Sequence, residues 1–85
     1  MRLDRFLWFA RFARSRPVAQ SLAESGAIRV DGRRADRAHT LVRVGAVLTM
    51  MVGSNVKVVR ILALPLRRGP AFEAARLYQD VVNEC

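Results

Sequence analysis

Arginines gather just ahead of Pro17, where the sequence predicts the start of a helix. Arg11, Arg14 and Arg16 come before this proline, and the next carboxylate along the chain is Glu24. The N-terminal end of a helix is the positive end of the backbone dipole, so a cation there is disfavoured by about 0.3–1 kcal/mol. A bound phosphate would reverse that penalty, because it would accept hydrogen bonds from the free backbone N–H groups and from the guanidinium groups. The pattern therefore predicts a phosphate-binding corner.

A second group of arginines flanks a predicted β-turn. Asp31 and Gly32 form a dipeptide that is typical of two-residue hairpin turns. The arginines around this turn are Arg29, Arg33, Arg34 and Arg37. Because the connections are short, we expect the seven guanidinium groups of the corner and the hairpin to form one continuous surface for the phosphates of a polyanion. The simpler alternative for Arg14 and Arg16 is exposure to solvent, or pairing with Glu24 or Asp31.

The composition also favours a polyanionic partner. The 85 residues include fifteen basic and seven acidic side chains, which gives a formal net charge of +8. Every basic residue except Lys57 is an arginine, whose planar guanidinium group binds phosphate oxygens in pairs and stacks on bases. Ten of the arginines lie in residues 1–43, so we expect the partner to contact the N-terminal half of the chain.

The sequence contains few residues that could catalyse a reaction or bind a metal. His39 and Cys85 are the single histidine and cysteine, and there is no carboxylate pair, CxxC spacing or Gly-rich phosphate loop. We therefore expect no enzyme activity, no metal and no cofactor. No apolar run approaches the roughly 20 residues of a membrane span. Charges interrupt the first twenty residues, so no signal peptide is expected and the cytoplasm is the expected location.

The periodicity of apolar residues predicts a first helix over residues 2–14. Its face toward the core would carry Leu3, Phe6, Leu7, Ala10 and Ala13. Its other face would carry Trp8, Phe9 and Phe12. We expect the last part of the chain to cover this aromatic face, with RNA bases or a membrane surface as the alternatives.

A second helix is predicted from Pro17 to Ser25. Arg16 is slightly favoured over Ser15 as its N-cap, because a residue before proline resists helical backbone angles. Gly26 suits the left-handed position that follows a helix. The expected core stripe of this helix consists of Val18, Leu22 and either Ala19 or Ala23.

The rest of the chain predicts a small sheet and a last helix. Residues 27–35 predict a hairpin, and residues 40–64 predict further strands with breaks at Gly45 and at residues 53–55. A last helix is expected over residues 71–85, with one face made of Ala74, Leu77, Tyr78, Val81 and Val82. The order predicts an α+β fold. We expect one folded unit in residues 1–64, followed in residues 65–85 by a linker and a helix that packs back on the first helix.

The stretches RLDRFLWFAR, RSR and AQSLAESGAIRVDGRR, with the strands that follow, resemble the S4 RNA-binding domain. The resemblance covers residues 2 to about 64. It implies two packed helices on a small curved sheet, and a protein that binds structured RNA without catalysis. By matching position, it implies RNA contacts at Arg11, Arg14, Ser15, Arg16, Gln20, Arg33 and Arg34.

The stretches LDRFLWFARF and RRGPAFEAARLYQ are similar to the ribosome-associated heat-shock branch of this family. That branch implies action on the large ribosomal subunit, especially on free subunits that hold a peptidyl-tRNA after heat stress. The sequence departs from the family pattern at Asp36, beside Arg37, where relatives are usually basic or neutral. Relatives also continue into a long basic tail beyond the position of Cys85, so no contacts of such a tail are expected within these residues. DNA stays an alternative ligand, because phosphate contacts alone do not distinguish it from RNA.

Overall fold

The helices and strands follow one another in the order predicted for an α+β fold. The computed structural model describes residues 1–52 and 54–81. Helices α1 (Leu3–Phe9) and α2 (Arg16–Glu24) come first, followed by strands β1 (Ile28–Val30) and β2 (Arg33–Ala35). Strands β3 (Val47–Val52) and β4 (Asn55–Ile61), the short helix α3 (Ala71–Ala74) and strand β5 (Tyr78–Asp80) complete the chain. The predicted fold class is therefore confirmed.

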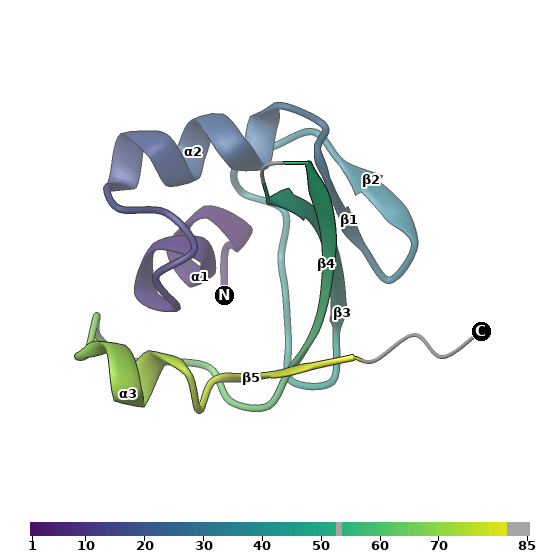
Figure 1. Cartoon of the computed structure of the whole chain (residues 1–85). Helices are drawn as coiled ribbons and strands as arrows, with labels where there is room; N and C mark the ends of the chain where they lie inside the picture. Colours follow the sequence, from purple (N-terminus) through teal and green to yellow (C-terminus); the bar gives the residue numbers. More distant parts are fainter. Residues whose placement is uncertain (53, 82–85) are drawn as a thin grey trace.

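The five strands form one antiparallel sheet in the order β2-β1-β3-β4-β5. Helices α1 and α2 lie on one face of this sheet, and α3 lies at the end of the molecule opposite α2 (Figure 1). Successive side chains of a strand point to opposite faces, so alternate residues reach the core. Ile28, Leu48, Val59 and Ile61 are fully buried between the sheet and the helices.

The first helix contributes the core residues that its periodicity predicts. Its predicted core face, from Leu3 to Ala13, is buried at all five positions. In α2, by contrast, the core positions are Ala19 and Ala23, whereas the larger Val18 is 40% exposed. The prediction for Val18 is wrong because α2 uses its two small residues to approach the core closely.

The first helix ends earlier than the sequence predicts, at Phe9 rather than near residue 14. Arg11 has a positive φ of 64°, a left-handed conformation that an α-helix cannot contain. The chain folds back at this point, and the N–H groups of Phe12 and Ala13 both donate to the carbonyl of Leu7, at 2.9 and 3.1 Å. This turn places Ala13 in the core and directs the next residues toward α2.

The N-cap of α2 is Ser15 and not Arg16. The Ser15 hydroxyl accepts a hydrogen bond from the backbone N–H of Val18 at 3.4 Å, and Arg16 is already helical. A serine side chain can satisfy a free N–H of the first turn, which an arginine cannot do, and this outweighs the restriction from Pro17. At the other end of the helix, Gly26 has the predicted left-handed conformation, with a φ of 80°.

The expected helix over residues 71–85 is replaced by a helical turn and a strand. Helix α3 ends at Ala74, and Tyr78–Asp80 pair with β4 as strand β5. The reason is that β4 would otherwise leave a free edge, whose hydrogen bonds β5 satisfies. Val82 and Cys85, which belong to the expected helix, lie outside the described residues.

The segment after β4 covers the aromatic face of α1 and of the turn after it. The rings of Phe12 and Tyr78 lie 4.6 Å apart, measured between centroids. Trp8 is covered instead by Arg68, whose guanidinium carbon lies 5.3 Å from the centre of the indole. Lys57 of β4 lies over both Phe12 and Tyr78. Within the described part of the chain, no helix is long and apolar enough to cross a membrane.

Candidate nucleic-acid interface

The corner between α1 and α2 presents two exposed arginines. Arg14 lies in the loop between the helices, and Arg16 is the first residue of α2, directly after its cap Ser15. The guanidinium carbon of Arg16 lies 5.4 Å from the centre of the Trp8 ring, a cation–π contact that holds this side chain beside α1. The corner thus combines one arginine held by a ring with one that extends freely from a loop.

A polar groove of about 550 Å³ opens beside this corner. We call it the corner groove; it is lined by Arg2, Asp4, Arg5, Arg16, Pro17 and Gln20. Arg16 and Gln20 were predicted to contact RNA, but Arg2 and Arg5 were not. Their only signal in the sequence is a spacing of three residues on one helix. The packing of α1 against α2 is what brings them to the same groove.

The hairpin of β1 and β2 presents its arginines on both faces of the sheet. Arg29 and Arg34 pair directly across the two strands, on the face that points away from the helices. Arg33 pairs with Val30 on the opposite face. Asp31 and Gly32 both have positive φ values, 52° and 84°, as a turn of type I′ requires. The predicted hairpin and its turn are therefore confirmed.

The hairpin is fixed to the neighbouring strand by Asp31. Its carboxylate accepts a hydrogen bond from the backbone N–H of Val47 at 2.9 Å, so it supports the turn rather than neutralising an arginine. A second groove, of about 620 Å³, lies next to the turn and is lined in part by Arg33, Arg34 and Arg43. Arg43 comes from the loop before β3 and had not been predicted as a site residue.

Arg34 also contacts the residue that follows α2. Its guanidinium group lies against Gly26, so closely that a Cβ atom on residue 26 would overlap it. Arg37 is exposed in the loop that follows β2. Arg34 thus connects the hairpin to the C-terminal end of α2.

Arg11 has a different role from the other corner arginines. Its Nε donates a hydrogen bond of 2.9 Å to the carbonyl of Gly69, in the segment between β4 and α3. Arg11 therefore fastens this segment to the turn after α1. Its remaining guanidinium N–H groups are the part that can face a ligand.

Arg14 and Arg16 lie at the N-terminal end of α2, whereas the β1–β2 hairpin follows its C-terminal end and contacts it through Arg34. The helix has nine residues, so its two ends lie about 14 Å apart. Among the described residues, the ion pairs involve Arg2, Lys57 and Arg67, so none of the seven predicted arginines is neutralised by a carboxylate. The alternative in which Arg14 and Arg16 pair with Glu24 or Asp31 is thereby excluded.

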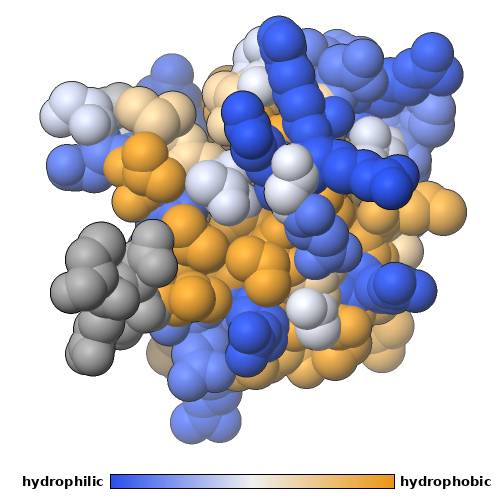
Figure 2. Space-filling model, turned by 90° about the vertical axis from the view of Figure 1, so that its right-hand side faces the viewer, coloured by the Kyte–Doolittle hydropathy of each residue, from blue (hydrophilic) through white to orange (hydrophobic). Residues whose placement is uncertain are grey.

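The sheet face that points away from the helices is different in character. Figure 2 shows apolar side chains over the middle of this face, with hydrophilic side chains gathered at its upper end. Met51 of β3 and Val56 of β4 are 48% and 61% exposed here. The middle of this face is therefore apolar, unlike the corner and the hairpin.

Known proteins resemble this chain in sequence and in fold. Residues 1–48 match the S4 domain family. The chain is 40% identical over 80 residues to the heat shock protein 15 homolog of Haemophilus influenzae, and 36% identical over 83 residues to heat shock protein 15 of Escherichia coli strain K12. These alignments cover 94% and 98% of this chain. They cover 60% and 62% of the relatives, so the chain spans about three fifths of the length of these curated proteins.

A solved structure has the same fold. The trimeric structure of Vibrio cholerae heat shock protein 15 matches with a TM-score of 0.89 and 34% sequence identity. The match covers 95% of this chain and 81% of that chain, so it includes the sheet and α3 as well as the two N-terminal helices.

Proposed function

The chain belongs to the S4 domain family and is homologous to heat shock protein 15 along nearly its whole length, and on this premise we propose that it binds structured RNA through the two ends of α2. One end is the corner with Arg14, Ser15 and Arg16. The other is the hairpin with Arg33 and Arg34. Proteins of this family bind RNA without catalysis, and RNA binding is what the arginine groups of this chain support.

The observation that carries the proposal is the absence of carboxylate partners. Within residues 1–52 and 54–81, the predicted arginines of the corner and hairpin take part in no ion pair, although seven acidic residues occur in the sequence. Exposed guanidinium groups that repel one another raise the free energy of the unbound protein. Phosphates would remove this repulsion and release the counterions of the RNA.

The spacing of the two groups fits contacts to separate phosphates. About 14 Å between the ends of α2 is several times the rise per nucleotide of one strand. The corner and the hairpin would therefore bind phosphates several nucleotides apart, or on the two strands of a helix. A rigid surface of this kind reads the shape and the 2′-hydroxyl groups of folded RNA rather than its base edges.

The identity of the RNA ligand is suggested by the relatives of this chain. We propose that the ligand is ribosomal RNA of the large subunit. The role of the protein would be related to heat stress or to stalled ribosomes. Large subunits that hold a peptidyl-tRNA would be its preferred target. Support comes from the heat-shock proteins that this chain resembles. A ribosomal ligand would place the protein in the cytoplasm.

A direct comparison of ligands tests the proposal. Binding is measured at one salt concentration to purified large ribosomal subunits, to an RNA stem-loop and to the DNA hairpin of matching sequence. We expect the subunits to bind most tightly and the DNA hairpin most weakly. Equal affinity for the RNA and DNA hairpins would contradict RNA recognition and indicate a general nucleic-acid-binding protein.

A further inference from the structure

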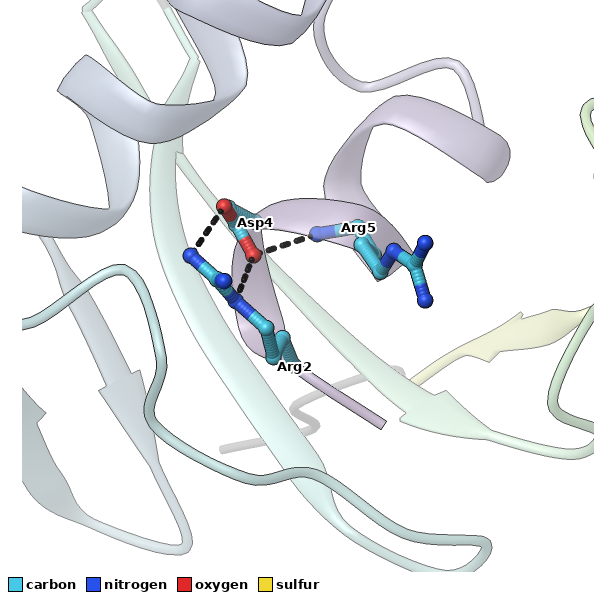
Figure 3. Close-up of polar contacts among 3 residues, drawn as sticks. All are labelled: Arg2, Asp4 and Arg5. Atoms are coloured by element: carbon cyan, nitrogen blue, oxygen red, sulfur yellow. Dashed lines mark hydrogen bonds and ion pairs between the residues drawn. The ribbon is translucent and has the colours of Figure 1, made fainter.

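Arg2 is held at both ends of its side chain. Its backbone forms an isolated β-bridge with Leu41, and the next N–H group, of Leu3, donates to the carbonyl of Thr40 at 2.7 Å. Its guanidinium group donates two hydrogen bonds to Asp4, from Nε to Oδ1 at 3.1 Å and from Nη2 to Oδ2 at 3.0 Å (Figure 3). A flexible side chain has thereby become a fixed one.

Asp4 is itself held in place and lies behind the arginine. Its Oδ1 also accepts a hydrogen bond from the backbone N–H of Arg5 at 2.8 Å. The side chain of Asp4 is 15% exposed, whereas that of Arg2 is 49% exposed. The side chain of Arg5 points away from the pair (Figure 3). The carboxylate therefore faces the protein and the guanidinium group faces solvent.

The arrangement leaves the corner groove with unused donors. A guanidinium group has five N–H donors, and Asp4 takes up two of those on Arg2. Arg16 and Gln20 line the same groove from α2, and neither has a side-chain hydrogen bond to another described residue. With Arg2, Arg5 and Arg16 against the single carboxylate of Asp4, the groove carries an excess of positive charge.

We propose that the corner groove binds one backbone phosphate of the RNA, with Arg2 and Arg16 as its two guanidinium ligands and Asp4 as the residue that positions Arg2. This inference rests on the proposed function, because it takes RNA as the ligand. Because Asp4 fixes the orientation of Arg2 before binding, the side chain of Arg2 loses less conformational entropy when it binds the phosphate.

The substitution Asp4→Asn separates positioning from simple electrostatics. It removes a negative charge next to the groove, so electrostatics alone predicts tighter RNA binding. Asparagine cannot accept two charge-assisted hydrogen bonds from Arg2, so loss of positioning predicts weaker binding instead. We expect the variant to bind large ribosomal subunits about threefold to tenfold more weakly than the wild type, in spite of its higher net charge.

Glu24→Gln is the matched control. Glu24 is exposed on α2 and forms no ion pair with a described residue, so its replacement removes the same charge without releasing an arginine. We expect this control to bind as tightly as the wild type or more tightly. Asp4→Glu keeps the carboxylate and is expected to restore part of the lost affinity. Thermal melting of each variant checks that the fold is retained.

A double-mutant cycle with Arg2→Ala completes the test. If Asp4 acts through Arg2, Asp4→Asn has no further weakening effect in a protein that already lacks Arg2. The slope of log K against log salt should also become shallower in Arg2→Ala, by at most about 0.7–0.9, because Arg16 still contacts the phosphate. Binding by Asp4→Asn as tight as the wild type, or an equal loss in the Arg2→Ala background, overturns the inference and leaves the proposed function standing. Failure of the wild-type protein to bind subunits overturns both.

Discussion

The guanidinium group of Arg34 lies against Gly26, the residue that follows α2, and leaves no space there for a side chain. One contact thus connects the end of a helix to the hairpin that is proposed to bind RNA. Because the position of Arg34 depends on an empty space at residue 26, a change at that residue should affect RNA binding as well as stability.

Gly26→Ala should therefore weaken both properties. An alanine in a left-handed conformation costs about 1–2 kcal/mol of stability, and its methyl group would displace Arg34. Gly45→Ala is the control, since Gly45 has a similar φ of 92° but nothing within 4 Å of a new Cβ atom. Urea unfolding should show similar losses of stability for the two variants, because the guanidinium group of Arg34 can move aside at little cost. RNA binding should fall only for Gly26→Ala; equal binding by both variants would refute the link.

Arg14→Ala should weaken RNA binding without changing stability. Arg14 is exposed in the loop between α1 and α2 and contacts no described carboxylate. Loss of one charged phosphate contact should cost about 1–2 kcal/mol of binding free energy. Arg76→Ala removes the same charge just after α3, outside the corner and the hairpin, and should bind nearly as the wild type does. Filter binding to large subunits compares the two.

Arg16→Ala should differ from Arg14→Ala in its effect on stability. Its guanidinium group lies over Trp8, so its removal should cost about 0.5–1 kcal/mol of folding free energy in addition to the loss in binding. Thermal unfolding separates the two variants. Identical melting curves would show that the contact with Trp8 contributes nothing to stability.

The salt dependence of RNA binding should reflect phosphate contacts at both ends of α2. If Arg14, Arg16, Arg33 and Arg34 each contact one phosphate, the slope of log K against log salt should be at least about −3 to −4. Removal of the two corner arginines, or of the two hairpin arginines, should reduce the steepness by about 1.5 in each case. Titrations over a range of salt concentrations measure this. A hairpin variant with an unchanged slope would limit the RNA contact to the corner.

Phe12→Ala should destabilise the protein by about 2 kcal/mol, because Phe12 packs on Tyr78 and helps to hold β5 against the core. Phe72→Ala removes the same side chain from α3, where Phe72 is 67% exposed, and should change stability by less than about 0.5 kcal/mol. Urea unfolding gives both values. Equal losses in the two variants would contradict the packing of Phe12 on Tyr78 as a source of stability.

The sequence predicts best the elements whose signals are local. The core face of the first helix follows from apolar residues at helical spacing, and Asp31-Gly32 identifies the hairpin turn. The end of the first helix was missed because it depends on a left-handed backbone conformation at Arg11 that its residue type does not dictate. The N-cap of α2 was missed because the hydrogen bond to the Ser15 hydroxyl outweighs the restriction from Pro17. The C-terminal residues have a helical pattern, yet Tyr78–Asp80 form a strand because β4 offers an edge.

The candidate site was predicted in its residue types but not in its arrangement. Arginines at the corner and the hairpin can be identified from the sequence, and so can the nine-residue helix between them, whereas the face of the sheet that each hairpin arginine occupies requires the structure. Arg2 and Arg5 join the site through the packing of α1 on α2. Arg11, expected to contact RNA, has its Nε bonded to Gly69 because the turn after α1 directs it toward the C-terminal segment.

Trp8 is the only tryptophan of the chain, and two guanidinium groups lie over its ring, at 5.4 Å for Arg16 and 5.3 Å for Arg68. The first belongs to α2 and the second to the segment after β4. Indole emission is sensitive to nearby charge and to solvent, so this residue serves as a built-in optical reporter. A single unlabelled fluorophore can therefore follow both the arrival of nucleic acid at α2 and the detachment of the C-terminal segment.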